Sequence, residues 1–226
     1  MTPTDRQRAA MGRLGVHAEA GDWCWIDKIP QPPAEVLEAA GSPRIRPAGL
    51  PFLGMVGVVL GAPFMPLLML LSLASDAEEA VKRSLGTQQE KDSWRAKKEN
   101  DKRRDAAIVQ QGFDNVFDGN WHGLAGQFLL HWYSHSTHHQ RMLLATPKEI
   151  VLAAPPKRVS VGRERKLQVV AHLPLSQATL VDPFSGEFET RMLLIRFRDG
   201  SWLRVNTEQL RGDLHTYALR QPLPDN

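Results

Sequence analysis

Four histidines within nine residues are the densest group of potential metal ligands or proton-transfer groups in the chain. They are His131, His135, His138 and His139. On a helix, spacings of three and four residues would place these imidazoles on one face, as metal binding favours. The intervening aromatic and hydroxyl residues favour a strand that runs into a loop, where the imidazoles would be scattered. Because no Cys, Asp or Glu motif at ligand spacing accompanies them, we predict no metal site, and a His-dependent metalloenzyme stays the minor alternative.

A second group of chemically capable residues is Asp118-Gly-Asn-Trp-His-Gly123. Because turns select Asp, Gly and Asn, we interpret this run as a turn within a linker. The sequence has no Gly-x-Ser-x-Gly elbow, no phosphate-binding Gly-rich loop and no His-Glu-x-x-His pair. The commonest hydrolase and nucleotide-binding classes are therefore not indicated. We predict a protein that is not an enzyme and that needs no cofactor.

Clustered cations offer a different chemistry, the binding of anions. The segment from Pro155 to Lys166, here called the basic loop, carries five basic residues against Glu164 alone. These candidate lipid- or anion-binding residues are Lys157, Arg158, Arg163, Arg165 and Lys166. Clustered Arg and Lys donors match phosphate well, although a merely solvated loop would have the same composition.

A second basic run extends from Lys82 to Arg104, with nine basic residues against four acidic ones. Its candidate anion-binding residues are Lys97, Lys98, Lys102, Arg103 and Arg104. Residues 76–110 are rich in Glu, Lys, Gln and Ala, which predicts a polar helix. Such a helix would attract anionic headgroups at about 1 kcal/mol per basic residue, or it would simply present a solvated face of mixed charge.

Just before this run, Leu50 to Ala74 contains no charged residue over 25 positions. As a helix it would be about 37 Å long, which exceeds a bilayer core of roughly 30 Å. We therefore predict a membrane anchor, which crosses once or, because Pro63 and Pro66 interrupt it, doubles back as a hairpin. The excess of Lys and Arg after the segment predicts a cytoplasmic C-terminal part.

The first 48 residues mix Pro, Gly, Ala and charge, and we predict an irregular arm with one short helix at Pro33 to Ala40. The pair Trp23 and Trp25 suits either packing on the main domain or an interfacial layer. The single Cys24 cannot form an internal disulfide. No secretory signal is indicated in the first forty residues.

After Gly123 the pattern changes to short apolar runs divided by turn signals, which predicts an antiparallel β domain. The expected strands are Gln127 to Ser134, Arg141 to Ala145, Glu149 to Ala153, Lys166 to Leu173, Thr179 to Val181, Glu187 to Arg198 and Ser201 to Val205. Asp199-Gly200 predicts a tight hairpin between the last two. An amphipathic helix is expected from Thr207 to Leu219.

This order of elements resembles the pleckstrin-homology-like (PH-like) fold, in particular its small bacterial members. The resemblance is carried by Leu144-Ala-Thr-Pro-Lys-Glu-Ile-Val-Leu-Ala153 and Leu194-Ile-Arg-Phe-Arg-Asp-Gly-Ser-Trp-Leu203, and it covers roughly residues 127–220. It implies a small barrel closed by a C-terminal helix, and contact with lipid headgroups, peptide binding or scaffolding. The basic loop departs from the spaced basic pattern of the lipid-specific members.

The predicted fold class is α+β, with an irregular arm (1–48), an apolar membrane segment (49–75), a basic polar helix and linker (76–122) and a PH-like β domain (123–226). The predicted function is a membrane-anchored, cytoplasm-facing binding or scaffold protein that engages anionic membrane lipids or a protein partner. The alternative is a soluble nucleic-acid-associated protein, which the interleaved acidic residues and the lack of a stacking platform disfavour. The pattern does not give the oligomeric state.

Overall fold

The computed structural model describes residues 11–49 and 87–221. The chain divides into two units, one formed by residues 1–49 and 112–226 and the other by residues 50–111. The first unit contains a sheet and short helices, and the described part of the second contains one long helix.

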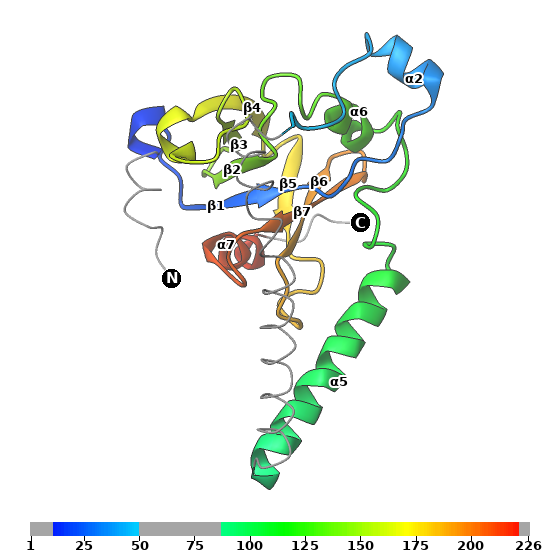
Figure 1. Ribbon diagram of the computed structural model, residues 1–226, viewed down its shortest axis with the longest axis vertical. Coiled ribbons are helices and arrows are strands. Elements are labelled where there is room, and N and C mark those ends of the chain that lie inside the picture. Colours follow the sequence, from blue (N-terminus) through cyan, green and yellow to red (C-terminus); the bar gives the residue numbers. More distant parts are fainter. Residues whose placement is uncertain (1–10, 50–86, 222–226) are drawn as a thin grey trace, which may run out of the picture. The chain divides into compact units, whose positions relative to one another are not determined.

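The sheet unit is built on a seven-stranded antiparallel sheet of order β4-β3-β2-β1-β7-β6-β5 (Figure 1). The strands are β1 (Ala20–Trp25), β2 (Gln140–Ala145), β3 (Glu149–Ala154), β4 (Gln168–Pro174), β5 (Ala178–Val181), β6 (Met192–Phe197) and β7 (Trp202–Thr207). The helices of this unit are α2 (Ala34–Ala39), α6 (Leu124–Leu130) and α7 (Asp213–Arg220), with a 3-10 turn η2 (Arg163–Lys166). The hairpin predicted at Asp199-Gly200 is confirmed between β6 and β7, with Gly200 at φ +85°.

Strand β1 lies in the middle of this sheet, although its residues fall within the predicted irregular arm. It pairs with β2 along its whole length and with β7 at Cys24 and Trp25. Its partners are more than one hundred residues away in the chain, so no local sequence signal marks it. Trp23 and Cys24 are accordingly core residues, with exposed fractions of 1% and 0%.

Strands β1, β2 and β3 bury side chains on both faces of the sheet. On one face Cys24, Leu143 and Leu152 belong to the main core, which α6 and α7 cover with Leu129 and Leu214. On the other face a smaller apolar cluster contains Met11, Trp23, Met142, Leu144, Val151 and Ala153. This two-sided burial explains the continuous apolar runs of β2 and β3, since alternation is expected only where one face is solvated.

Helix α6 replaces the strand predicted at Gln127 to Ser134, and that prediction is wrong. The helix has no side-chain cap of its own at Gly123. Its first amides are bound instead by Asp199 and Ser201, about 75 residues away. A cap supplied from so distant a segment leaves no trace in the local pattern. Helix α7 also begins later than predicted, because Thr207 ends β7 and uses its hydroxyl to donate to the Arg191 carbonyl.

Helix α5 (Gln88–Gln110) is the polar helix predicted from composition. Thr87 and Glu90 form a capping box, in which each side chain binds the backbone amide of the other residue. None of its residues is buried. Residues 76–86, which the prediction included, lie outside the described residues.

The predicted α+β class with a membrane segment and a closed PH-like barrel is corrected on two counts. The sheet is open, because β4 and β5 each have a neighbouring strand on one side only. In addition, no helix in the described ranges is both long enough and apolar enough to cross a membrane. Helix α5 has the length but is polar, and α2, α6 and α7 are too short. Within the described ranges the predicted membrane anchor and membrane localisation are therefore not supported. Leu50 to Ala74, the segment on which both predictions rested, lies outside the described residues.

Candidate functional site

The basic loop joins β3 to β4 and contains η2. Its five cations fall into two groups, since Arg158 and Arg163 are half-buried whereas the other three are exposed. The exposed residues are Lys157, Arg165 and Lys166. The structure therefore gives different roles to residues that the sequence presents as one cluster.

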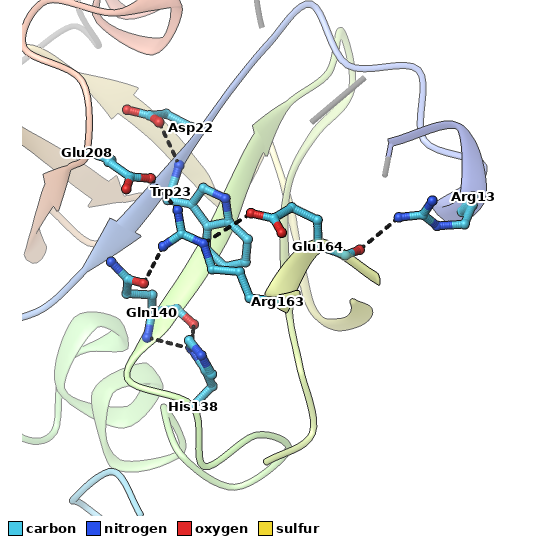
Figure 2. Close-up of polar contacts among 8 residues, drawn as sticks. All are labelled: Arg13, Asp22, Trp23, His138, Gln140, Arg163, Glu164 and Glu208. Carbon is cyan, nitrogen blue, oxygen red and sulfur yellow. Dashed lines mark hydrogen bonds and ion pairs between the residues drawn. The ribbon is translucent and has the colours of Figure 1, made fainter. Parts of the chain in front are cut away.

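Arg163 holds the loop against the sheet. Its Nη2 donates to Glu208 Oε2 at 2.6 Å, and its Nη1 donates to the side chain of Gln140. The guanidinium also lies 4.1 Å from the ring centroid of Trp23, and Figure 2 shows it stacked against the indole. A planar guanidinium suits this task, because it can stack on an aromatic face while its edge donates several hydrogen bonds.

The partners of Arg163 are fixed in turn by strand β1. The Glu208 amide donates to the Trp23 carbonyl at 2.7 Å. The buried Asp22 carboxylate accepts from the amides of Trp23 and Gln209, each at 2.8 Å. Burial raises the pKa of Asp22 and outweighs the two amide hydrogen bonds, which lower it. The backbone hydrogen bonds of Glu208 and Gln209 to strand β1 therefore fix Glu208 in position for its contact with Arg163.

Further contacts tie down the rest of the basic loop. Ser136 Oγ donates to the Pro155 carbonyl at 2.6 Å, and Arg158 Nη1 donates to the Ala48 carbonyl at 2.9 Å. Gly162 adopts φ +69°, a left-handed conformation that other residues rarely take, and the turn it makes leads into η2. The next residues are held by Arg13, which donates to the Glu164 carbonyl at 2.9 Å (Figure 2).

The outward side of the loop is open. Among the described residues, no hydrogen bond or ion pair engages the side chains of Lys157, Arg165 or Lys166. Val161 is 86% exposed at the tip, which is unusual for an apolar side chain in an ordered segment. The loop therefore presents three exposed cations and one exposed apolar residue on a backbone that is held from several sides.

The other predicted cations lie on α5, in the second unit, and the two units are not placed relative to one another. Arg104 pairs with Asp101 at 2.8 Å and Asp105 at 2.9 Å, and the Lys98 ammonium lies 5.2 Å from the ring centroid of Trp94. Arg103 also has a partner. Lys97 and Lys102 are exposed. Part of the positive charge on the described helix is thus balanced within the helix itself.

The four histidines separate into two pairs. His138 and His139 stack with ring centroids 4.7 Å apart, and His138 Nδ1 accepts from the Gln140 amide at 3.1 Å. Burial, reinforced by His138 and neighbouring arginines, lowers the pKa of His139 to about 4. His131 and His135 are exposed instead. Within the described ranges, no three His, Cys, Asp or Glu side chains gather as a metal site would require.

The Asp118 to Gly123 turn is confirmed, with Asp118 accepting from the Asn120 amide at 3.1 Å.

One buried charge was not singled out by sequence reasoning. Arg141 on β2 is 1% exposed and lines a cavity together with His131 and His135. The only sequence signal was a lone basic residue at the head of an apolar strand.

No family model, curated protein or solved structure matches this chain. The PH-like resemblance accordingly stays a prediction, and function has to be argued from the geometry.

Proposed function

We propose that the protein is a non-catalytic binding module that docks an acidic segment of a protein partner on the basic loop. One observation carries the proposal: Arg158 and Arg163 hold the loop in place, while Lys157, Arg165 and Lys166 face solvent without a partner among the described residues. The arrangement separates cations that build the surface from cations that are available to bind.

The fixed backbone supports binding because little order has to be created when a partner arrives. Flexible loops lose affinity through the entropy of ordering, about 0.5–1.5 kcal/mol for each immobilised side chain. Here the contacts of Arg163 with Trp23, Gln140 and Glu208 already exist in the free protein. A partner would order only the tips of the exposed side chains.

An acidic peptide suits this surface better than a single phosphate group. The exposed cations are spread over ten positions of the loop, with the apolar Val161 between them. An extended chain with several carboxylates and an apolar residue could meet all of them at once.

The expected affinity is modest. Three exposed ion pairs contribute roughly 0.2–1 kcal/mol each, and burying Val161 adds about 1.5 kcal/mol or more. Even before the cost of association, this total of roughly 2–4.5 kcal/mol corresponds to a dissociation constant no lower than about 0.5 mM, so binding in the millimolar range or weaker is expected at low salt. The module would serve transient contacts that weaken as salt screens the charges.

The test compares two variants that lose the same charge in different places. The loop variant carries Lys157→Gln, Arg165→Gln and Lys166→Gln, and the control carries Lys97→Gln, Lys98→Gln and Lys102→Gln on α5. A ten-residue Glu peptide with a central Leu is titrated into each full-length protein by fluorescence anisotropy. We expect the loop variant to bind about tenfold more weakly and the α5 control to stay within about twofold of wild type.

Two results would contradict the proposal. An equal loss of peptide affinity in the loop variant and the α5 control would show that binding depends only on the net charge of the protein. Saturable binding of phosphatidylserine vesicles or of duplex DNA that depends on the same three residues, without binding of the peptide, would assign the loop to a different class of partner.

A further inference from the structure

A cavity of about 160 Å³ lies between the end of α6 and strands β2, β3 and β4. Its exposed lining residues are His131 and His135, and its most deeply buried ones are Arg141 and Leu152, each 1% exposed. The walls are apolar and include Phe128, Leu152 and Val170. A single buried cation in a mostly apolar cavity is the feature to be explained.

Arg141 is buried without the counter-charge that buried cations usually have. Its guanidinium donates to the backbone carbonyls of His138, Trp132 and Ser136. Those three bonds use three of its five N–H groups, and among the described residues no carboxylate pairs with it. Burial lowers the pKa of Arg141 to about 10, so the side chain remains cationic at neutral pH. Two donors and a full positive charge are left beside the cavity.

The aromatic neighbours of Arg141 do not replace a counter-ion. The guanidinium carbon lies 4.6 Å from the ring centroid of Trp132 and 5.2 Å from that of Tyr133. These contacts favour a cation but accept no conventional hydrogen bond. Trp132, which also lines the cavity, has a buried Nε1–H with no acceptor among the described residues. A ligand that brings oxygen acceptors would meet the unused donors of Arg141.

The geometry points to a binding site for a compact organic monocarboxylate, whose apolar body fills the cavity and whose carboxylate meets Arg141. This site is separate from the basic loop and does not depend on the function proposed there. The apolar walls disfavour a bare phosphate, which needs more donors around it than one arginine provides. The volume limits the apolar body to about the size of one benzene ring, since an apolar cavity of roughly 150 Å³ holds benzene.

Benzoate is therefore the probe, and isosteric benzamide is its uncharged control. Arg141 itself is a poor position for substitution, because its three carbonyl contacts organise the turn after α6. The cavity is closed instead by Ala171→Phe on β4, a half-exposed lining residue. The matched control is His172→Phe, an exposed neighbour on the same strand that does not line the cavity.

Isothermal titration of the full chain gives the dissociation constants. We expect saturable binding of benzoate, binding of benzamide that is at least about tenfold weaker, and a similar loss of benzoate affinity in Ala171→Phe. The His172→Phe variant should bind benzoate within about twofold of wild type. A peptide that ends in Phe, as free acid and as amide, identifies the natural source of the carboxylate. Tighter binding of the free-acid peptide than of benzoate indicates a chain terminus, and weaker binding indicates a free small acid.

Three results would overturn the inference. They are no saturation by benzoate up to about 10 mM, equal affinities for benzoate and benzamide, or unchanged benzoate binding in Ala171→Phe. Circular dichroism and urea unfolding of Ala171→Phe check that the variant is folded, so a loss of binding can be assigned to the filled cavity.

Discussion

Two arginines of the sheet unit are held by aromatic rings and carbonyl oxygens, and in the described ranges only one of them, Arg163, is also paired with carboxylates. Arg163 stacks on Trp23 and also reaches Glu208, whereas Arg141 is surrounded by backbone carbonyls and two aromatic rings. In both cases the contacts of the guanidinium group hold neighbouring segments of the chain in place. The first of these arginines is one of the contacts that hold the basic loop, and with it the exposed cations, in place.

The stacked histidines predict a specific loss of stability in acid. The pKa of His139 is lowered to about 4, first by burial and then by His138 and neighbouring arginines, whereas an unfolded His titrates near 6.5. Between these values the unfolded state binds the proton and the folded state does not. The free energy of unfolding should therefore be greatest above pH 6.5 and fall as the pH drops toward 4.

His139→Leu should remove part of this dependence. Between pH 7.5 and 4.5 the free energy of unfolding of the variant should fall by about 1 kcal/mol less than that of wild type. This figure is discounted because solvent screens the half-exposed ring. Urea unfolding at the two pH values measures it. If the variant and the wild type lose stability equally over this range, another group is responsible.

At the scale of elements, the short helix α6 depends on a cap that comes from the β6–β7 hairpin. Asp199 Oδ2 accepts from the Leu124 amide at 2.8 Å, and Ser201 Oγ accepts from the Ala125 amide at 3.0 Å. Gly126 lets the helix pack closely on the preceding turn, since a Cβ there would lie 2.4 Å from the Asn120 carbonyl oxygen. The position of α6, and with it one wall of the cavity, is set by these contacts.

Asp199→Ala should destabilise the sheet unit by about 1–2 kcal/mol at pH 7, the usual cost of losing an N-cap. Slight burial alone would raise the pKa of Asp199, but hydrogen bonds from Leu124 and Ser201 lower it overall. The cap therefore stabilises the fold above the ordinary Asp pKa of about 3.9, and its contribution is lost as the pH falls through the lowered folded-state value. Urea unfolding of wild type and Asp199→Ala at pH 7 and pH 2.5 checks both statements. If the free energies of unfolding of the two proteins differ equally at both pH values, the predicted pH dependence is contradicted.

The same elements show what local sequence can and cannot predict. Strands β2, β3 and β7 carry apolar runs or clear alternation, and the predicted ranges lie within two residues of the observed ones at either end. Strand β1 and helix α6 were missed because their stability comes from segments far away in the chain. The basic loop was recognisable from composition. The sequence did not show which cations of the loop hold the fold and which are exposed, because the partners of Arg163, namely Trp23, Gln140 and Glu208, come from three other segments.

At the scale of the whole molecule, positive charge occurs in two places with different surroundings. On α5 part of it is paired within the helix, as in Arg104 with Asp101 and Arg95 with Asp92. On the basic loop the cations are sorted into those that hold the fold and those that face solvent. A net charge of +3 alone would not distinguish these surfaces. The proposed function depends on that difference.

The most direct test of this account is the affinity of the acidic peptide for Arg163→Lys. The substitution keeps the charge and leaves Lys157, Arg165 and Lys166 untouched, but a lysine cannot both stack on Trp23 and bind Gln140 and Glu208 together. If the loop binds because it is held in advance, the dissociation constant should rise about three- to tenfold at the same salt concentration. An unchanged dissociation constant in a folded Arg163→Lys protein would contradict the account.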